Sequence, residues 1–171
     1  MNEGREIIIR DARPEERPAI SALTWSAYNQ YATIMTPRAW AGLRGSIANG
    51  LASDAPAERI VAERDGELVG GVMLFPPDTS AYGAFVASSA VPELRLLAVA
   101  PGARGAGIGH ALTEECIRRA RASGASALGL HTSKSLTVAI GLYERLGFVR
   151  YPAGDFQPAG AELVMAYQLL L

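Results

Sequence analysis

The chain has 171 residues, of which 49% are hydrophobic and 19% are charged. This size suits one globular domain with a buried core, so we expect residues 1–171 to form a single domain, and the composition excludes a disordered chain. The formal net charge of −1 at pH 7 gives no general attraction to nucleic acid or to an anionic membrane, so neither is expected as a partner.

The first half of the chain predicts a strand, two helices and a hairpin. In chain order these are a strand over 7–9, helices over 14–31 and 37–50, and hairpin strands over 59–63 and 68–75. Asp11 is a candidate cap for the first helix. Asn49-Gly50 is expected to end the second helix. The Asp65-Gly66 pair between two apolar runs is typical of a tight β-hairpin turn.

The second half predicts strands that alternate with helices. After a loop over 76–92 we expect strands over 93–99 and 127–131, helices over 107–123 and 135–146, a strand from 148, a loop over 152–160 and a last strand over 163–169. The nearly continuous apolar end of 93–99 favours a central strand that is covered on both faces. The order of elements predicts a mixed sheet with helices packed on it.

A glycine-rich turn lies between the strand at 93–99 and the following helix, with the sequence Arg104-Gly105-Ala106-Gly107-Ile108-Gly109. Glycine lets a ligand approach the backbone closely, and the first helical turn presents unpaired N–H groups. Such a turn suits a phosphate or pyrophosphate. A tight turn without a ligand is an equally good interpretation of these six residues alone.

Two other nucleotide sites fit the sequence poorly. A dinucleotide site needs an acidic residue about 20 positions further on, and the next strand ends at Leu130-His131-Thr132 without one. A triphosphate-binding loop needs Gly-Lys-Ser/Thr, which this turn lacks.

The few cysteine and histidine residues limit the kinds of site that the protein can have. Cys116 is the only cysteine, and His110 and His131 lie far apart in sequence, so we expect no disulfide and no metal site. No stretch approaches the roughly 18 apolar residues of a membrane span, and residues 1–10 lack a signal core. We expect a cytoplasmic protein. Because Lys134 is the only lysine among 16 basic residues, GC-rich bacterial coding is favoured.

Two motifs together resemble the GNAT acetyltransferase superfamily. Arg104, Gly107 and Gly109 match its Arg/Gln-x-x-Gly-x-Gly/Ala signature, and residues 139–148 are similar to its second motif, Ala-Ile-x-Leu-Tyr-Glu-x-x-Gly-Phe. The resemblance covers residues 93–150. It implies an α/β fold with a central mixed sheet of six to seven strands flanked by about four helices. It also implies acetyl-CoA as acyl donor and no metal.

The resemblance assigns a coenzyme A site to three segments. A strand bulge would open a slot for the pantetheine arm, and the turn would hold the pyrophosphate. The implied cofactor-binding residues are Leu97, Ala98, Val99, Arg104, Gly105, Ala106, Gly107, Ile108, Gly109, His110, Ala139, Leu142 and Tyr143. His110 is equally well explained as a solvated helix residue. Leu136 departs from the family pattern, which has Asn there, and Ser133, Ser135 or Thr137 are candidates to replace that contact.

Two residues are implied to act in proton transfer. Tyr143 occupies the family position of the group that protonates the departing thiolate. Glu93 opens the central strand, where some members place a general-base glutamate, although an exposed strand-end glutamate is an equal alternative. The Val99 N–H is the candidate oxyanion donor.

The function that this resemblance implies is transfer of an acetyl group to a primary amine of a small molecule, peptide or protein, by direct attack in a ternary complex. The alternative is a non-catalytic acyl-CoA-binding sensor. The acceptor pocket of the family is built from regions that hold Trp25, Tyr28, Tyr31, Trp40, Tyr82, Phe85 and Phe156. Each of these aromatic residues is also explained by core packing. A homodimer is compatible with the sequence.

Overall fold

The structure is a computed structural model that describes residues 6–78, 89–159 and 161–171. Its strands form one seven-stranded sheet in the order β1-β2-β3-β4-β5-β7-β6. The strands are β1 (Ile8–Asp11), β2 (Glu58–Arg64), β3 (Glu67–Phe75), β4 (Glu93–Val99), β5 (Ala127–Ser133), β6 (Val149–Arg150) and β7 (Val164–Leu170). Strands β4 and β5 pair in parallel, and the other neighbouring strands pair antiparallel. The predicted mixed sheet is confirmed.

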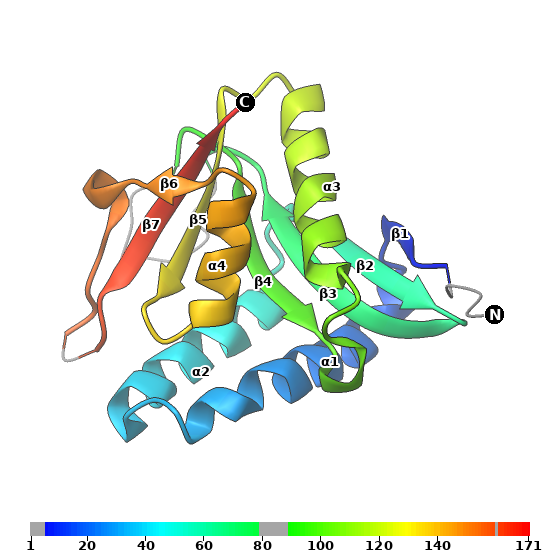
Figure 1. Cartoon of the computed structure of the whole chain (residues 1–171), viewed down its shortest axis with the longest axis horizontal. Helices are drawn as coiled ribbons and strands as arrows, with labels where there is room; N and C mark the ends of the chain where they lie inside the picture. The colour runs from blue at the N-terminus through cyan, green and yellow to red at the C-terminus, as the bar shows by residue number, and fades with distance from the viewer. Residues whose placement is uncertain (1–5, 79–88, 160) are drawn as a thin grey trace.

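The described residues also form four α-helices, and these pack on the sheet (Figure 1). They are α1 (Arg17–Tyr28), α2 (Pro37–Ala52), α3 (Ile108–Ala122) and α4 (Thr137–Arg145). Short 3-10 turns are η1 (Pro14–Glu16), η2 (Asn29–Ala32), η4 (Pro101–Ala103) and η5 (Pro152–Gly154).

Helices α1 and α3 cover opposite faces of the central strands. A Cβ added at Gly70 of β3 would lie 2.7 Å from Ile108 of α3, whereas one added at Gly71 would approach Ile20 of α1 at 4.0 Å. Successive residues of a strand point to opposite faces, so the two helices lie on different sides. The main core, which includes Leu112, Cys116 and Leu128, lies under α3. Gly70 lets the first turn of α3 sit close to the sheet.

The hairpin prediction is confirmed, and two helix signals were wrong. Asp65 and Gly66 both have positive φ, at 54° and 80°, and connect β2 to β3 as a two-residue turn. Asp11 does not cap a helix, because it lies in β1 and its carboxylate binds Arg119. Gly50 does not end α2; the helix runs on to Ala52, and a Cβ on this buried glycine would lie 2.8 Å from Leu96 of β4.

The predicted helix over 14–31 begins later as an α-helix. Residues Pro14–Glu16 form η1, and α1 starts at Arg17. Pro18 explains the delay, because its ring has no N–H and clashes with the carbonyl four residues earlier if an α-helix continues through it. The chain therefore makes a 3-10 turn first.

An ion-pair cluster ties α3 to β1 and β2. The Arg119 guanidinium binds Asp11 Oδ1 at 2.6 Å, Glu115 Oε1 at 2.8 Å and the Glu58 carboxylate, and the Arg119 side chain is 17% exposed. The loss of Arg119 removes the cation that these three carboxylates share, while Glu115 keeps its second partner, Arg118.

Replacing Arg119 with methionine is expected to lower the free energy of unfolding by about 1–3 kcal/mol. Methionine keeps the apolar packing of the side-chain stem and removes the charge. Urea denaturation measures the change. Arg121→Met on the exposed face of the same helix is the control and should cost less than about 0.5 kcal/mol. Equal losses of unfolding free energy in the two variants would show that the ion-pair cluster does not contribute to stability.

Three paired carboxylates predict acid sensitivity. Hydrogen bonds from Arg118 to Glu115, from Arg10 to Glu16 and from Arg150 to Asp155 lower each carboxyl pKa to about 2 from ordinary values of 4.5, 4.5 and 3.8. A depressed carboxyl pKa contributes stability above the unfolded value and loses it as pH falls toward the folded one. We expect the urea midpoint to be constant from pH 7 to about 5 and to fall below about 4.5. A midpoint unchanged at pH 3 would contradict this.

Candidate functional site: a gap between two parallel strands

Strands β4 and β5 part after two residue pairs. Glu93 pairs with Gly129 and Leu94 with Leu130, and the parallel ladder goes no further although both strands continue. Backbone groups on the facing edges of both strands beyond this point are therefore not used in a β4–β5 ladder. This gap is where a ligand with amide groups finds strand-like partners.

A β-bulge in β4 lies beside the gap. Gly71 pairs with Ala98 and Met73 with Arg95, so β4 carries one more residue than β3 over this interval. Leu96, within the bulge, has a φ of 54°, which is rare for a non-glycine residue. A bulge bends its strand and re-aims its groups. The bulge that the resemblance implies is confirmed.

Tyr28 of α1 fixes the bulge from outside the sheet. Its hydroxyl donates to the Leu97 carbonyl at 3.0 Å. Burial raises the pKa of the Tyr28 phenol, so the group stays protonated and remains a donor. The sequence analysis named Tyr28 only as one of the candidate aromatic residues of the acceptor pocket. The hydrogen bond to Leu97 was not predicted, because it joins residues 69 positions apart.

For the acetyl-CoA site that the resemblance implies, replacing Tyr28 with phenylalanine is expected to raise the KM for acetyl-CoA by roughly 3–10-fold, because loss of one buried hydrogen bond costs about 1 kcal/mol. Steady-state assays at varied acetyl-CoA measure it. The Tyr31→Phe variant is the control, because Tyr31 contacts the Tyr28 ring at a centroid distance of 6.0 Å without bonding β4. An unchanged KM in Tyr28→Phe would remove this residue from the description of the site.

The end of β4 directs backbone groups into the gap. The Ala100 N–H donates to Val69 of β3 at 2.9 Å. Because N–H groups of successive strand residues point to alternate sides, the Val99 N–H points away from β3, toward β5. This direction agrees with the predicted role of Val99 as an oxyanion donor.

The glycine-rich turn forms an open cradle at the start of α3. Gly107 is the N-cap residue with φ 76° and ψ 8°, and Gly105 has a φ of 77°. A Cβ at either position would have no neighbouring heavy atom of the described residues within 4 Å. The backbone is therefore accessible there, and the N–H groups of Ile108 and Gly109 precede the first helical hydrogen bond. This geometry suits a phosphate group.

Arg104 and His110 flank this cradle but point elsewhere. The Arg104 guanidinium donates to the Ala27 carbonyl at 3.0 Å and to Gln30 at 3.3 Å, at the end of α1. His110 Nδ1 lies 3.3 Å from Glu114 on the exposed face of α3. Both remain predictions as cofactor contacts, and each has a protein partner in this structure.

Helix α4 closes the gap on the side of α3. Tyr143 is 6% exposed and its ring meets Phe148 edge-on at 5.8 Å. Leu142 lies next to the turn, since a Cβ at Gly109 would be 3.3 Å from it. Leu142 and Tyr143 therefore come from the helix that the second motif predicts. Ala139, one turn earlier on α4, packs against the main core.

The segment before α4 is held by Glu162. The hydroxyls of Ser133 and Ser135 both donate to this carboxylate, the second at 3.2 Å, while Leu136 is buried. These two serines thus have a structural partner. The sequence offered no signal for Glu162, which is 27 residues from Ser135.

Glu93 is buried and contacts a histidine. Its carboxylate lies 3.2 Å from His131 Nδ1, and His131 Nε2 lies 2.8 Å from the Gly154 carbonyl. The exposed strand-end interpretation of Glu93 is wrong, because its side chain is 9% exposed. Sequence reasoning assigned no role to His131. The alternation of residues 127–133 could have indicated that His131 lies beside Glu93. His131 and Gly129 share one face of the strand, opposite Leu128 and Leu130.

One buried hydroxyl on β5 has no hydrogen-bond partner among the described residues. Thr132 is 5% exposed, and its Oγ1 is unsatisfied. It lies on β5 beyond the last pair with β4. An orphaned buried hydroxyl is costly unless a water or ligand satisfies it. Together with the glycine cradle and the parted strands, it shows that the residues present fit a long, partly polar ligand such as coenzyme A.

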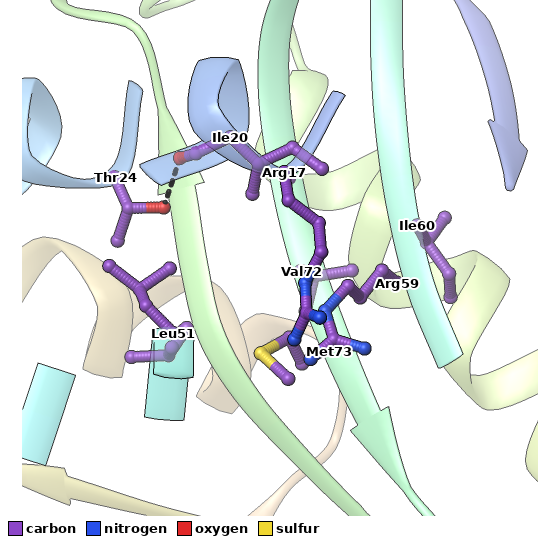
Figure 2. Close-up of a pocket in the computed structure, with 10 residues that line it drawn as sticks. Arg17, Ile20, Thr24, Leu51, Arg59, Ile60, Val72 and Met73 are labelled. Carbon is purple, nitrogen blue, oxygen red and sulfur yellow. Dashed lines mark hydrogen bonds between the residues drawn. The ribbon is translucent and has the colours of Figure 1, made fainter. Parts of the chain in front are cut away.

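A separate cavity of about 20 Å³ lies on the α1 side of the sheet. Figure 2 shows the residues that line it. Two arginines enter it together, and both donate to the Ser53 carbonyl at the end of α2, Arg17 at 2.9 Å and Arg59 at 2.7 Å. Burial, and next the charge of Arg17, lower the pKa of Arg59. A space of this size holds about one water. The two cations cap a helix end, and the cavity is too small for an acceptor.

Comparison with known proteins identifies the family of this chain. The sequence matches the acetyltransferase (GNAT) family over residues 17–148, so the chain belongs to this family. It is 35% identical over 96 residues to a mycothiol acetyltransferase from Streptomyces avermitilis, over 56% of this chain and 28% of that protein. It is 36% identical over 107 residues to the IAA acetyltransferase of Azospirillum brasilense, over 62% of this chain and 64% of that protein. The chain thus spans less than a third of the mycothiol acetyltransferase.

Solved structures share the whole fold. A GNAT-family acetyltransferase from Staphylococcus aureus superposes with a TM-score of 0.70 at 17% identity, over 97% of this chain and 99% of that one. A GNAT-family acetyltransferase from Brucella melitensis in complex with acetyl-CoA gives 0.62 at 22% identity, over 98% and 89%. The ribosomal-protein-alanine N-acetyltransferase of Brucella melitensis gives 0.62 at 26% identity, over 96% and 99%. The predicted GNAT fold is confirmed.

Among the residues that the structure describes, none of the helices has the length and apolar character that crossing a membrane requires.

Proposed function

We propose that this protein transfers the acetyl group of acetyl-CoA to a primary amine of a small molecule or a peptide, by direct attack within a ternary complex. The observation that carries this proposal is the parting of β4 and β5 next to the glycine cradle of α3. Relatives solved with acetyl-CoA or coenzyme A support the donor. Because strands from both halves of the chain share one sheet, we also infer that the chain acts as one domain.

Backbone groups of α3 and β4 bind and orient the donor. Acetyl-CoA supplies an activated acetyl carbon. The first-turn N–H groups from Ile108 onward hold its phosphates, and the β4 edge at Leu97 to Val99 holds its amide-bearing arm. The Val99 N–H stabilises negative charge on the acetyl oxygen. These contacts bind and orient the donor, and they leave the proton transfers to two side chains.

Glu93 and Tyr143 carry out the two proton transfers of the reaction, as general base and general acid. Glu93 accepts the proton that the acceptor nitrogen loses as it bonds to the acetyl carbon, and Tyr143 donates its phenolic proton to the departing sulfur. The two residues then return to their starting states by exchange with solvent. No proton is gained or lost overall, and the products are the acetylated amine and free thiol.

Titration calorimetry with acetyl-CoA, followed by thiol-release assays on an amine panel, tests the proposal. The panel includes alanine-terminated peptides, a lysine peptide and amino sugars, since relatives range from mycothiol to ribosomal-protein-alanine acetyltransferases. We expect micromolar binding and thiol release with at least one amine. Binding without release across the panel supports the second candidate, a non-catalytic acyl-CoA sensor, which the buried Leu136 in place of Asn favours. No binding contradicts both.

A further inference from the structure

Glu93 and His131 meet at the point where β4 and β5 part. The last pair of the ladder is Leu94 with Leu130, so His131 is the first β5 residue beyond it. The Glu93 side chain passes over Gly129, where an added Cβ would lie 3.4 Å from Oε1, and its Oε2 reaches His131 Nδ1 at 3.2 Å. A carboxylate from the start of β4 is thereby carried toward the gap.

The contacts of the imidazole determine where its protons lie. The Gly154 carbonyl only accepts hydrogen bonds, so His131 Nε2, at 2.8 Å, must carry a proton. Gly154 is tightly packed, since a Cβ there would lie 2.9 Å from the Ala166 Cβ. A neutral imidazole with its proton on Nε2 would turn the bare Nδ1 toward a carboxylate oxygen. The Glu93 contact therefore requires a second proton between Nδ1 and Oε2.

That second proton belongs to the imidazole. Imidazole is ordinarily a stronger base than a carboxylate. The two side chains are 4% and 9% exposed, and a buried carboxylate is stable only beside a compensating cation. The rings of His131 and Phe156, with centroids 5.3 Å apart, restrict the imidazole further. An imidazolium bonded to an ionised carboxylate satisfies both contacts.

We propose that His131 is a positioning residue, a doubly protonated imidazolium that holds Glu93 ionised and oriented at the mouth of the β4–β5 gap. Both ring nitrogens are engaged, so His131 acts through Glu93, whose other oxygen, Oε1, takes the proton of the acceptor amine. The role of Glu93 in this inference rests on the proposed function. The protonation state of the pair does not.

Other charges surround the pair. Arg95 lies two residues along β4 on the same face, where it donates to Ser46 of α2. Asp155 follows η5 and is held by Arg150 of β6 at 2.7 Å. The hydrogen bond from Arg150 lowers the pKa of the Asp155 carboxyl to about 2, so this group does not titrate near neutral pH.

The first test is nitrogen-15 NMR of the imidazole side chains in the free protein at pH 7.5. The chain has only two histidines, and a His110→Gln variant assigns their signals. We expect protons on both ring nitrogens of His131. In Glu93→Gln, the Gln amide donates to Nδ1, so His131 should become neutral with a proton on Nε2 only. A bare Nδ1 in the unaltered protein would overturn the proposal.

The second test uses two substitutions that each keep one contact. Asparagine places an amide near the position of Nδ1 and can still donate to Glu93, whereas glutamine places one near Nε2 and bonds only to Gly154. We expect His131→Gln to lower kcat by roughly 10²-fold, and His131→Asn to lower it by less than about tenfold. The KM for acetyl-CoA should stay within about twofold in both. In both variants the acidic limb of the kcat profile should move to higher pH, because Glu93 has lost a cationic neighbour. The move should be larger in His131→Gln, which also loses the hydrogen bond to Glu93.

The outcomes separate this inference from the proposed function. Equal losses in the two variants with unmoved pH profiles would show a merely structural histidine and overturn the inference, even in an active enzyme. A fully protonated His131 in a protein that acetylates no amine would support the pair and contradict the proposed function. If a His131 variant unfolds, Gly154→Ala takes its place. This substitution displaces the carbonyl that accepts from His131 Nε2, and it should lower kcat by less than about tenfold, as expected for His131→Asn.

Discussion

Replacing Tyr143 with phenylalanine is expected to lower kcat by roughly 10²-fold or more while leaving the Kd of acetyl-CoA within about twofold. The Tyr143 ring is buried on α4 and packs edge-on against Phe148. Phenylalanine keeps this ring contact and removes the phenolic hydroxyl. Under the proposed function, the loss of this proton donor should slow the departure of the sulfur more than it weakens binding of the donor. Steady-state assays measure kcat, and calorimetry measures the Kd separately.

Tyr167→Phe is the matched control for this substitution. Tyr167 is also buried, and its hydroxyl lies 3.5 Å from the Glu144 carboxylate. Its loss should leave kcat within about twofold. If Tyr143→Phe weakened acetyl-CoA binding strongly and left turnover unchanged, Tyr143 would be a binding residue and not the acid.

Local signals in the sequence were sufficient for the turn and its helix. Gly105 and Gly107 adopt positive φ as a close-approach turn requires, and α3 begins at Ile108, within one residue of its expected start. Such features depend on a few neighbouring residues, whose conformational preferences are local. Tyr143 was named through the resemblance to the second motif of the family, and the structure places this residue on the buried side of α4.

Contacts between distant segments were not predictable in this way. The Glu93–His131 contact depends on the parallel register of β4 and β5, and the Tyr28–Leu97 bond depends on how α1 crosses the sheet. Parallel register is set by packing of both faces and not by the paired strands alone. The partner of Arg104 was not predictable either. This residue is the arginine that the motif requires, but its guanidinium donates to a carbonyl at the end of α1.

A negative charge at Gly107 is expected to abolish coenzyme A binding. In Gly107→Asp the Kd of acetyl-CoA should rise at least roughly 100-fold, whereas Gly107→Asn should raise it less than about tenfold. Gly107 has a left-handed backbone, with φ 76° and ψ 8°, and open space at the Cβ position. Asn and Asp tolerate this conformation better than other side chains. Because the two are nearly the same shape, the difference between them measures charge.

A side chain at this positive φ strains the backbone, so both variants should have a lower Tm than the unaltered protein. The charge of Asp at the start of α3 interacts favourably with the helix dipole, so the Tm of Gly107→Asp should equal or exceed that of Gly107→Asn. Loss of binding in Gly107→Asp, at a Tm no lower than that of Gly107→Asn, then assigns the phosphates to this turn. Calorimetry at 50 and 500 mM salt adds a second criterion, because screening should narrow the gap between the variants. Equal affinities of Asp and Asn at low salt would place the phosphates elsewhere.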